Sequence, residues 1–266
     1  MSVKPVMAFL LGASLSAALA AGLWLRSEPS PERLRTTLLE KPEFLADHPE
    51  ILEAARAVLQ TRMLAAQGAE RAVLIREKWQ ALTHAAFTPT IGSPDAPLVL
   101  LEFTDYTCEP CRKSAPAVNA ALSGSSDVRV AVLLLPIGGA LAEYAARVAW
   151  AAYRQNPDRF AELHHRLLNP TAQLGQDSIL AAARELGFDI EQIEREAATA
   201  ESRRYFDQVR MFAEDMHISG VPAFALDEQL ILGGITAAQL ETLIQAARAT
   251  RATGEAQLTA SSEEKP

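Results

Sequence analysis

Little in this 266-residue sequence points to nucleic acid or to a bound nucleotide. The formal net charge is −8, whereas nucleic-acid binding depends on clustered Lys and Arg, so no nucleic-acid partner is expected. The sequence has no Walker loop and no glycine-rich dinucleotide fingerprint, and no cofactor is predicted. Hydrophobic residues make up 49% and charged residues 22%, which predicts a packed globular core rather than a disordered chain.

Cysteine is scarce, because the chain has only Cys108 and Cys111, both within the stretch FTDYTCEPCRKSAP. The pair could be a metal clip, a structural crosslink or a redox-active pair. Zinc usually takes four protein ligands, and the sequence offers neither a third cysteine nor a His-x-x-His pattern. The adjacent His164 and His165 would point about 100° apart on a helix, so we expect an ordinary surface pair and predict no metal site. Copper(I), which needs only soft ligands, and an inert disulfide remain alternatives.

The amino terminus has the pattern of a targeting segment. Lys4 precedes a run from Val6 to Leu25 that contains no charged residue and is long enough to span a bilayer. Ala18-Leu19-Ala20 is a small-x-small pattern of the kind that signal peptidases recognise. We interpret residues 1–26 as a signal peptide or an N-terminal membrane anchor. Additional cysteines would form incorrect disulfides in an oxidising compartment, so an exported chain whose two cysteines form one C-x-x-C motif indicates a redox function.

Residues 27–85 are predicted to form a helical N-terminal region. Four leucines recur at the seven-residue spacing of a helix-association seam: Leu38, Leu45, Leu52 and Leu59. Pro42 and Pro49 interrupt this ladder, and proline is favoured in a first helical turn, so a long helix should start near Pro49 and run to about Thr83. The region is either a self-packed helical collar or an oligomerisation stalk.

Residues 86–250 show the pattern of an α/β domain. Apolar runs predict buried strands at Leu98–Thr104 and Val128–Ile137, with a helix from Cys108 to about Leu122 between them. A helical block, two short strands and a closing helix follow, at Gly139 to about Met216, Ala223–Leu232, and Thr236 to about Thr250. This order predicts a mixed sheet with a large helical insertion. The polar residues 251–266 are expected to form a disordered tail.

The position of the cysteines at a helix start has chemical consequences. Residues three apart share one helical face, so the two sulfurs can meet as a disulfide. Cys108 would lie over unpaired N–H groups at the positive end of the helix, which favours a thiolate there. Pro110 stiffens the loop between the sulfurs, whereas the Glu109 carboxylate should make the pair a less extreme oxidant. We expect Cys108 to be the exposed nucleophile and Cys111 the shielded thiol that resolves a mixed disulfide.

Two segments resemble the DsbA-like thiol–disulfide oxidoreductases: Leu101–Thr107 before the cysteines and Ile218–Phe224 after the helical block. The resemblance covers about Phe87 to Thr250 and implies a thioredoxin-like mixed sheet with a helical insertion. The stretch from Pro42 to Ala55 further resembles the subgroup that contains the suppressor-of-copper-sensitivity C proteins.

The resemblance also implies roles for single residues. Pro222 matches the cis-proline that lies beside the disulfide in the family, where the backbone of Val221 pairs with an extended substrate. Glu109 and Pro110 are predicted to take part in substrate binding with Val221. Glu102 matches the buried acid of the family, which would exchange protons with Cys111.

The function implied is that of an exported oxidoreductase acting on periplasmic proteins. It would lie on the periplasmic side of the bacterial inner membrane, anchored by residues 6–25 or released after cleavage. Expected partners are unfolded or misoxidised cysteine-containing proteins and a membrane redox partner that resets the thiols. Several catalytic domains on one stalk would face one substrate chain, so a homo-oligomer is expected and isomerase or reductase activity is favoured over oxidase. The alternative is a non-enzymatic periplasmic copper(I)-binding protein that uses the same two thiols.

Overall fold

The computed structural model describes residues 30–83, 88–171, 173–227 and 229–263. It divides into two compact units, Met1–Leu64 and Ala65–Pro266. The apolar segment 6–25 lies outside the described residues, so the predicted signal peptide or anchor stays a prediction. Within the described ranges, no helix is long and apolar enough to cross a membrane.

The first unit is helical as far as it is described. It contains α2 (Pro31–Glu40), α3 (Glu43–Asp47) and the first part of α4 (Pro49–Thr83), which continues into the second unit. The predicted breaks near Pro42 and Pro49 and the predicted end of the long helix at Thr83 are confirmed. No residue of α2 or α3 is buried.

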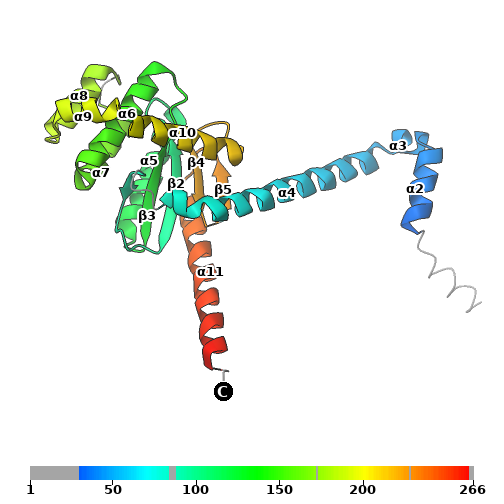
Figure 1. Cartoon of the computed structure of the whole chain (residues 1–266). Coiled ribbons are helices and arrows are strands. Elements are labelled where there is room, and N and C mark those ends of the chain that lie inside the picture. Colours follow the sequence, from blue (N-terminus) through cyan, green and yellow to red (C-terminus); the bar gives the residue numbers. More distant parts are fainter. Residues whose placement is uncertain (1–29, 84–87, 172, 228, 264–266) are drawn as a thin grey trace, which may run out of the picture. The chain divides into compact units, whose positions relative to one another are not determined.

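The second unit is built on a five-stranded mixed sheet (Figure 1). The strands lie in the order β1 (Thr90–Ile91), β3 (Val128–Leu134), β2 (Leu98–Thr104), β4 (Ala223–Leu226) and β5 (Gln229–Leu232). β2 and β3 are parallel, and the other neighbours are antiparallel. Every residue of the central β2 is buried, as its run of apolar residues predicts.

Helices complete the domain. α5 (Glu109–Gly124) joins the two parallel strands, and α11 (Ala237–Glu263) packs against α5, β2 and β4. Five helices are inserted between β3 and β4: α6 (Ala140–Gln155), α7 (Pro157–Leu168), α8 (Gln176–Glu185), α9 (Ile190–Ala197) and α10 (Ala200–Asp215). The predicted α/β class, with a mixed sheet and a large helical insertion after an all-helical region, is confirmed.

Two boundaries differ from the sequence prediction. β3 ends at Leu134 rather than Ile137, because Pro136 has no N–H with which to extend the ladder. α11 continues to Glu263, so the expected disordered tail is wrong over 251–263. Ala, Arg, Glu, Gln and Leu dominate this stretch, and such residues favour a helix even where the surface is polar.

Candidate active site

Cys108 is the N-cap of α5, immediately after the loop that follows β2. Its sulfur accepts a hydrogen bond from the Cys111 backbone N–H at 3.2 Å. Cys108 is half-buried, whereas Cys111 is 0% exposed, and both thiols are free. The expected arrangement of one accessible and one shielded thiol is therefore present.

Cys111 lies one turn into α5 and belongs to the hydrophobic core. Burial raises the pKa of its thiol well above the ordinary value, and its contact with Cys108 raises the pKa further. The Asp105 backbone and the Thr104 hydroxyl act in the opposite direction. Cys111 therefore holds its proton firmly and needs a base before it can attack a mixed disulfide.

The Val221–Pro222 peptide bond is cis, as the sequence resemblance implies. The Cys108 thiol donates a hydrogen bond to the Val221 carbonyl oxygen at 3.4 Å, across 113 residues of sequence. The pairing of Phe103 with Ala223 brings the two segments together, since it aligns the end of β2 with the start of β4. Pro222 and Val221 thus lie beside the cysteines.

Asp105 fixes the turn that carries Cys108, a role that the sequence reasoning missed. Its Oδ1 accepts hydrogen bonds from the N–H and the hydroxyl of Thr107 at 2.7 and 2.8 Å. Its Oδ2 accepts from the N–H groups of Ile137 and Gly138, both at 2.8 Å. Any Cβ at Gly138 would collide with the Thr107 hydroxyl, so the two loops can approach this closely only with glycine there. In the sequence, the acidic residue directly after the predicted strand Leu98–Thr104 could have indicated this role.

Glu102 is buried in the middle of β2, which confirms its predicted burial. Burial raises the pKa of its carboxyl to about 7, and the Thr104 hydroxyl partly opposes this shift. His164 Nε2 lies 3.9 Å from Glu102 Oε2. The expected His164–His165 surface pair is wrong for His164, which is buried, while His165 is exposed.

A family model described as Thioredoxin matches residues 85–246, more than half of the chain. The chain belongs to the thioredoxin family. The predicted DsbA-like, thioredoxin-like fold is therefore confirmed, and this fold with its Cys-x-x-Cys pair is consistent with thiol–disulfide exchange.

Solved and curated proteins resemble parts of this chain. The catalytic domain of Proteus mirabilis ScsC is 26% identical with a TM-score of 0.61, covering 67% of this chain and 98% of that chain. Disulfide bond formation protein D of Bacillus subtilis is 25% identical over 93 residues, 34% of this chain and 42% of that protein. Na(+)/H(+) antiporter NhaA 3 of Salinispora tropica is 29% identical over 135 residues, 50% of this chain and 20% of the antiporter. The chain thus spans well under two thirds of the length of these curated relatives.

The remaining predicted residues of this thioredoxin-family site lie in the first turn of α5. Pro110 and Glu109 are both exposed. The Glu109 carboxylate is 2.7 Å from Lys113 Nζ, and this hydrogen bond lowers its pKa. The Lys113 ammonium thereby offsets part of the negative charge that Glu109 places beside Cys108.

A cavity of about 200 Å³ borders the segment that leads into Val221 and Pro222. It is lined by the loop after β3, by α10 and by the residues before the cis-proline: Leu135, Pro136, Ile137, Phe206, Arg210, Ala213, Glu214, Ile218 and Ser219. Ile137 is 56% exposed. The surface next to the cysteines of this thioredoxin-family domain therefore offers apolar contacts.

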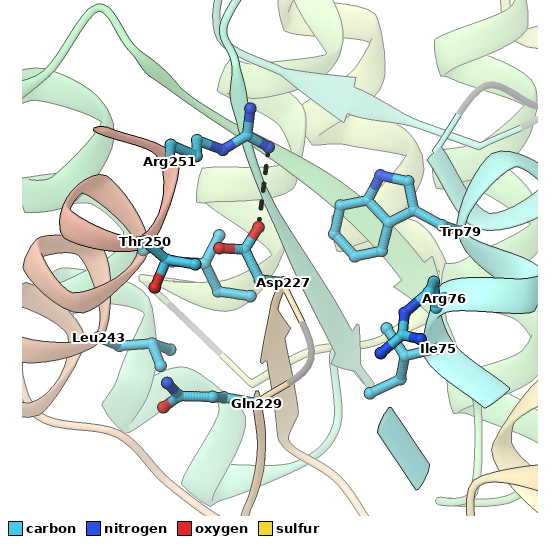
Figure 2. Close-up of a pocket in the computed structure, with 10 residues that line it drawn as sticks. Ile75, Arg76, Trp79, Asp227, Gln229, Leu243, Thr250 and Arg251 are labelled. Atoms are coloured by element: carbon cyan, nitrogen blue, oxygen red, sulfur yellow. Dashed lines mark ion pairs between the residues drawn. The ribbon is translucent and has the colours of Figure 1, made fainter. Parts of the chain in front are cut away.

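A larger cavity of about 770 Å³ lies at the other end of the sheet. Figure 2 shows Trp79 and Arg76 of α4 facing the β4–β5 turn, where Asp227 pairs with Arg251 of α11. This cavity is away from the cysteines, because Leu226 pairs with Leu100 near the start of β2. Among the residues that the structure describes, no group of three or more His, Cys, Asp or Glu could hold a metal ion.

Proposed function

We propose that this chain is an exported thiol–disulfide oxidoreductase that acts on cysteines of periplasmic proteins, as an isomerase or reductase rather than an oxidase. The observation that carries the proposal is the asymmetry of the pair, in which Cys108 is accessible and Cys111 is fully buried one turn away. Such a pair favours ordered exchange through one sulfur.

The reaction begins at Cys108. Its thiolate attacks a substrate disulfide, forming a mixed disulfide with one substrate sulfur and releasing the other as a thiolate. Deprotonated Cys111 then attacks Cys108, forming the Cys108–Cys111 disulfide and releasing the second substrate sulfur. In isomerisation, a substrate thiolate attacks the mixed disulfide instead, and the enzyme leaves in its dithiol form.

Unfolded or misoxidised proteins are the proposed substrates. The Val221 carbonyl oxygen lies 3.4 Å from Cys108 Sγ, where the backbone of an extended chain could pair with it. The cavity next to the cis-proline and the exposed Ile137 would accept an apolar side chain near the substrate cysteine. Exposed Glu109 and Pro110 border Cys108 in sequence and complete the proposed binding surface.

The likeness to named proteins supports this reaction class. The Bacillus subtilis relative is named Disulfide bond formation protein D, and the similar stretch covers 34% of this chain. We propose by analogy that a membrane redox partner resets the thiols. The uncharged run 6–25 supports a location on the periplasmic side of the inner membrane, either anchored or released by cleavage.

The N-terminal helices are proposed to form an oligomerisation stalk. Large apolar side chains are exposed along them: Leu34, Leu39, Phe44, Ile51, Leu52, Val58, Leu59, Met63 and Leu64. Exposed apolar surface of this extent on helices marks an association site, and a second copy with the same heptad leucines offers a matching seam. Several active sites on one stalk would raise their effective concentration around one misfolded chain.

Reactivation of a scrambled-disulfide ribonuclease tests the function and the stalk together. A soluble chain that begins at Ser27 is compared with a chain that begins at Ala65, the start of the second unit. A start near residue 85 is unsuitable, because Ile75 and Leu82 of α4 are fully buried in the core. We expect the longer chain to be oligomeric by analytical ultracentrifugation and to reactivate the substrate faster. Equal reactivation, or a monomeric longer chain, would refute the stalk, and no reactivation or reduction by either would refute the function.

A further inference from the structure

Ser114 carries a buried hydroxyl on the helix that holds the cysteines. It lies three residues after Cys111 in α5 and is 1% exposed. Its hydroxyl donates a hydrogen bond to the Pro110 carbonyl oxygen at 3.0 Å and accepts one from the Ile235 backbone N–H at 3.1 Å. Pro110 lies between the two cysteines, whereas Ile235 lies in the loop between β5 and α11. The hydroxyl therefore joins the first turn of α5 to a segment 121 residues away.

The same loop also contacts the cis-proline. The N–H of Gly233 donates a hydrogen bond to the Pro222 carbonyl oxygen at 2.9 Å. This bond continues the antiparallel ladder of β4 and β5 beyond its last residue pair. Gly233 and Ile235 are two residues apart in sequence. The 233–235 loop thus connects the cis-proline on one side with the Ser114 hydroxyl on the other.

Glycine at position 234 allows this loop to approach α5. A Cβ atom on Gly234 would lie 3.3 Å from Ser114 Oγ, which is tighter than ordinary van der Waals contact. An alanine at this position would therefore push the loop and the hydroxyl apart by a few tenths of an ångström. The close approach of the 233–235 loop to Ser114 depends on the missing side chain.

A proline inside α5 leaves the start of this helix less firmly held by the rest of it. Pro116 has no N–H, so the hydrogen bond that would run from this position to the Arg112 carbonyl oxygen is missing. Cys108 and Cys111 both lie on the amino-terminal side of this break. Ser114 lies between the break and the cysteines, and its bond to the 233–235 loop fixes this part of α5 from outside the helix.

The direct contact between the cysteine helix and the cis-proline segment is lost during the reaction. In the free dithiol, the Cys108 thiol donates a hydrogen bond to the Val221 carbonyl oxygen at 3.4 Å. The Cys108 thiolate and the mixed disulfide both lack this hydrogen, so neither can form the bond. The hydrogen bonds of Ser114 involve no reacting atom and can persist in every state of the pair.

We propose that Ser114 is a positioning residue that holds the cis-proline segment at a fixed distance from the cysteine helix while a substrate chain is bound. The proposal rests on the exchange reaction proposed above and adds the contact that keeps the two halves of its binding surface together. A chain that pairs with the Val221 backbone must at the same time present its sulfur to Cys108. The contacts from Ser114 through the 233–235 loop to Pro222 set the spacing between these two points.

The test compares two disulfides that react with the same Cys108 sulfur in the full reduced chain. A symmetrical disulfide of a short cysteine-containing peptide can pair with the Val221 backbone, whereas hydroxyethyl disulfide has no peptide group. Release of the first thiol, followed by acid quench and mass spectrometry, gives the rate constant of mixed-disulfide formation for each. Ser114→Ala removes the hydroxyl, and Ser123→Ala, at an exposed position of the same helix, is the matched control.

We expect Ser114→Ala to lower the rate constant for the peptide disulfide by about five- to tenfold, the usual effect of one buried hydrogen bond, and to change that for hydroxyethyl disulfide by less than about twofold. The loss should appear as a higher half-saturating peptide concentration rather than a lower maximal rate, because the Cys108 sulfur itself is unchanged. Ser123→Ala should match the wild type with both disulfides. A purely stabilising role of Ser114 would lower the free energy of unfolding and leave both rate constants unchanged.

Gly234→Ala perturbs the same contact from the loop. It should lower the rate constant for the peptide disulfide in the wild-type background. In the Ser114→Ala background it should have little further effect, because the oxygen that its Cβ atom meets is no longer present. If Ser114→Ala does not fold, Gly234→Ala decides alone, and an unchanged ratio of the two rate constants would then overturn the proposal.

The outcomes separate this inference from the proposed function. Equal changes for both disulfides in Ser114→Ala, or no change for either, would overturn the positioning role and leave the exchange reaction intact. Additive effects of Ser114→Ala and Gly234→Ala would overturn the contact between the hydroxyl and the loop as the cause. Failure of the wild-type chain to react with either disulfide would refute the proposed function itself.

Discussion

Replacing Glu102 with Gln should make the reduced protein more stable at neutral and alkaline pH. Burial raises the pKa of this carboxyl from an ordinary 4.5 to about 7, so the folded state prefers the neutral acid. Its contribution to stability is fully present below pH 4.5 and is lost as pH rises through 7. At ~1.36 kcal/mol per pH unit of pKa difference, the loss reaches about 3 kcal/mol by pH 8. Gln cannot ionise and escapes this loss.

Denaturant unfolding of the two reduced proteins between pH 4.5 and 8 measures the difference. We expect Glu102→Gln and wild type to have similar stability at pH 4.5 and to diverge to about 3 kcal/mol at pH 8, a sizeable part of the ~5–15 kcal/mol typical of a domain. The low pKa of His164, about 3 through burial, destabilises both proteins as pH falls below 6.5, and the difference cancels this effect. The pH range of the experiment ends at 8, which is below the ordinary thiol pKa of 9.0, so that ionisation of the thiols does not affect the comparison.

Glu53 provides the matched control, because its side chain is exposed on α4. Glu53→Gln should follow the wild-type profile throughout. A Glu102→Gln protein that is no more stable than wild type at pH 8, or that differs from it equally at every pH, would refute the reasoning.

Two further predictions concern the surroundings of Cys108. Asp105→Asn should lower the free energy of unfolding by about 2–3 kcal/mol and slow mixed-disulfide formation, since the amide cannot accept all four hydrogen bonds that the carboxylate accepts. Calorimetry measures the stability, and alkylation kinetics measure the reactivity of Cys108. Unchanged values would contradict the role of Asp105 in fixing this turn. Ile137→Ser should weaken turnover of a denatured protein substrate several-fold while leaving reduction by glutathione unchanged, because only a polypeptide reaches the apolar cavity. An equal effect on both substrates would contradict this substrate site.

Local patterns predicted much of the fold. The apolar run LVLLEFT forms a fully buried strand, and proline marks the start of α4. Cys108 as an N-cap and Cys111 as a buried thiol follow from their spacing and from the helix that starts between them. These features depend on neighbours in sequence, which is why they could be read without coordinates.

Tertiary contacts account for what was missed. His164 is buried because α7 packs against α5, and its hydroxyl partner Tyr106 is 58 residues away. His164 is four residues after the buried Phe160 and three before the buried Leu167, so it lies on the apolar face of the helix. This spacing was better evidence for burial than the adjacent His165 was for a surface pair. The hydrogen bonds that the Asp105 carboxylate accepts from the loop after β3 likewise join segments that only the folded sheet brings together.

The most direct test of the account is trapping of mixed disulfides by single cysteine variants. Cys111→Ser leaves the accessible sulfur without its resolving partner, whereas Cys108→Ser leaves only a buried thiol whose pKa burial raises. Each variant is incubated with an unfolded protein that carries a disulfide, alkylated, and analysed by non-reducing electrophoresis and mass spectrometry. The account predicts abundant adducts on Cys108 in Cys111→Ser and almost none in Cys108→Ser. Equal trapping by both variants, or none by Cys111→Ser, would contradict it.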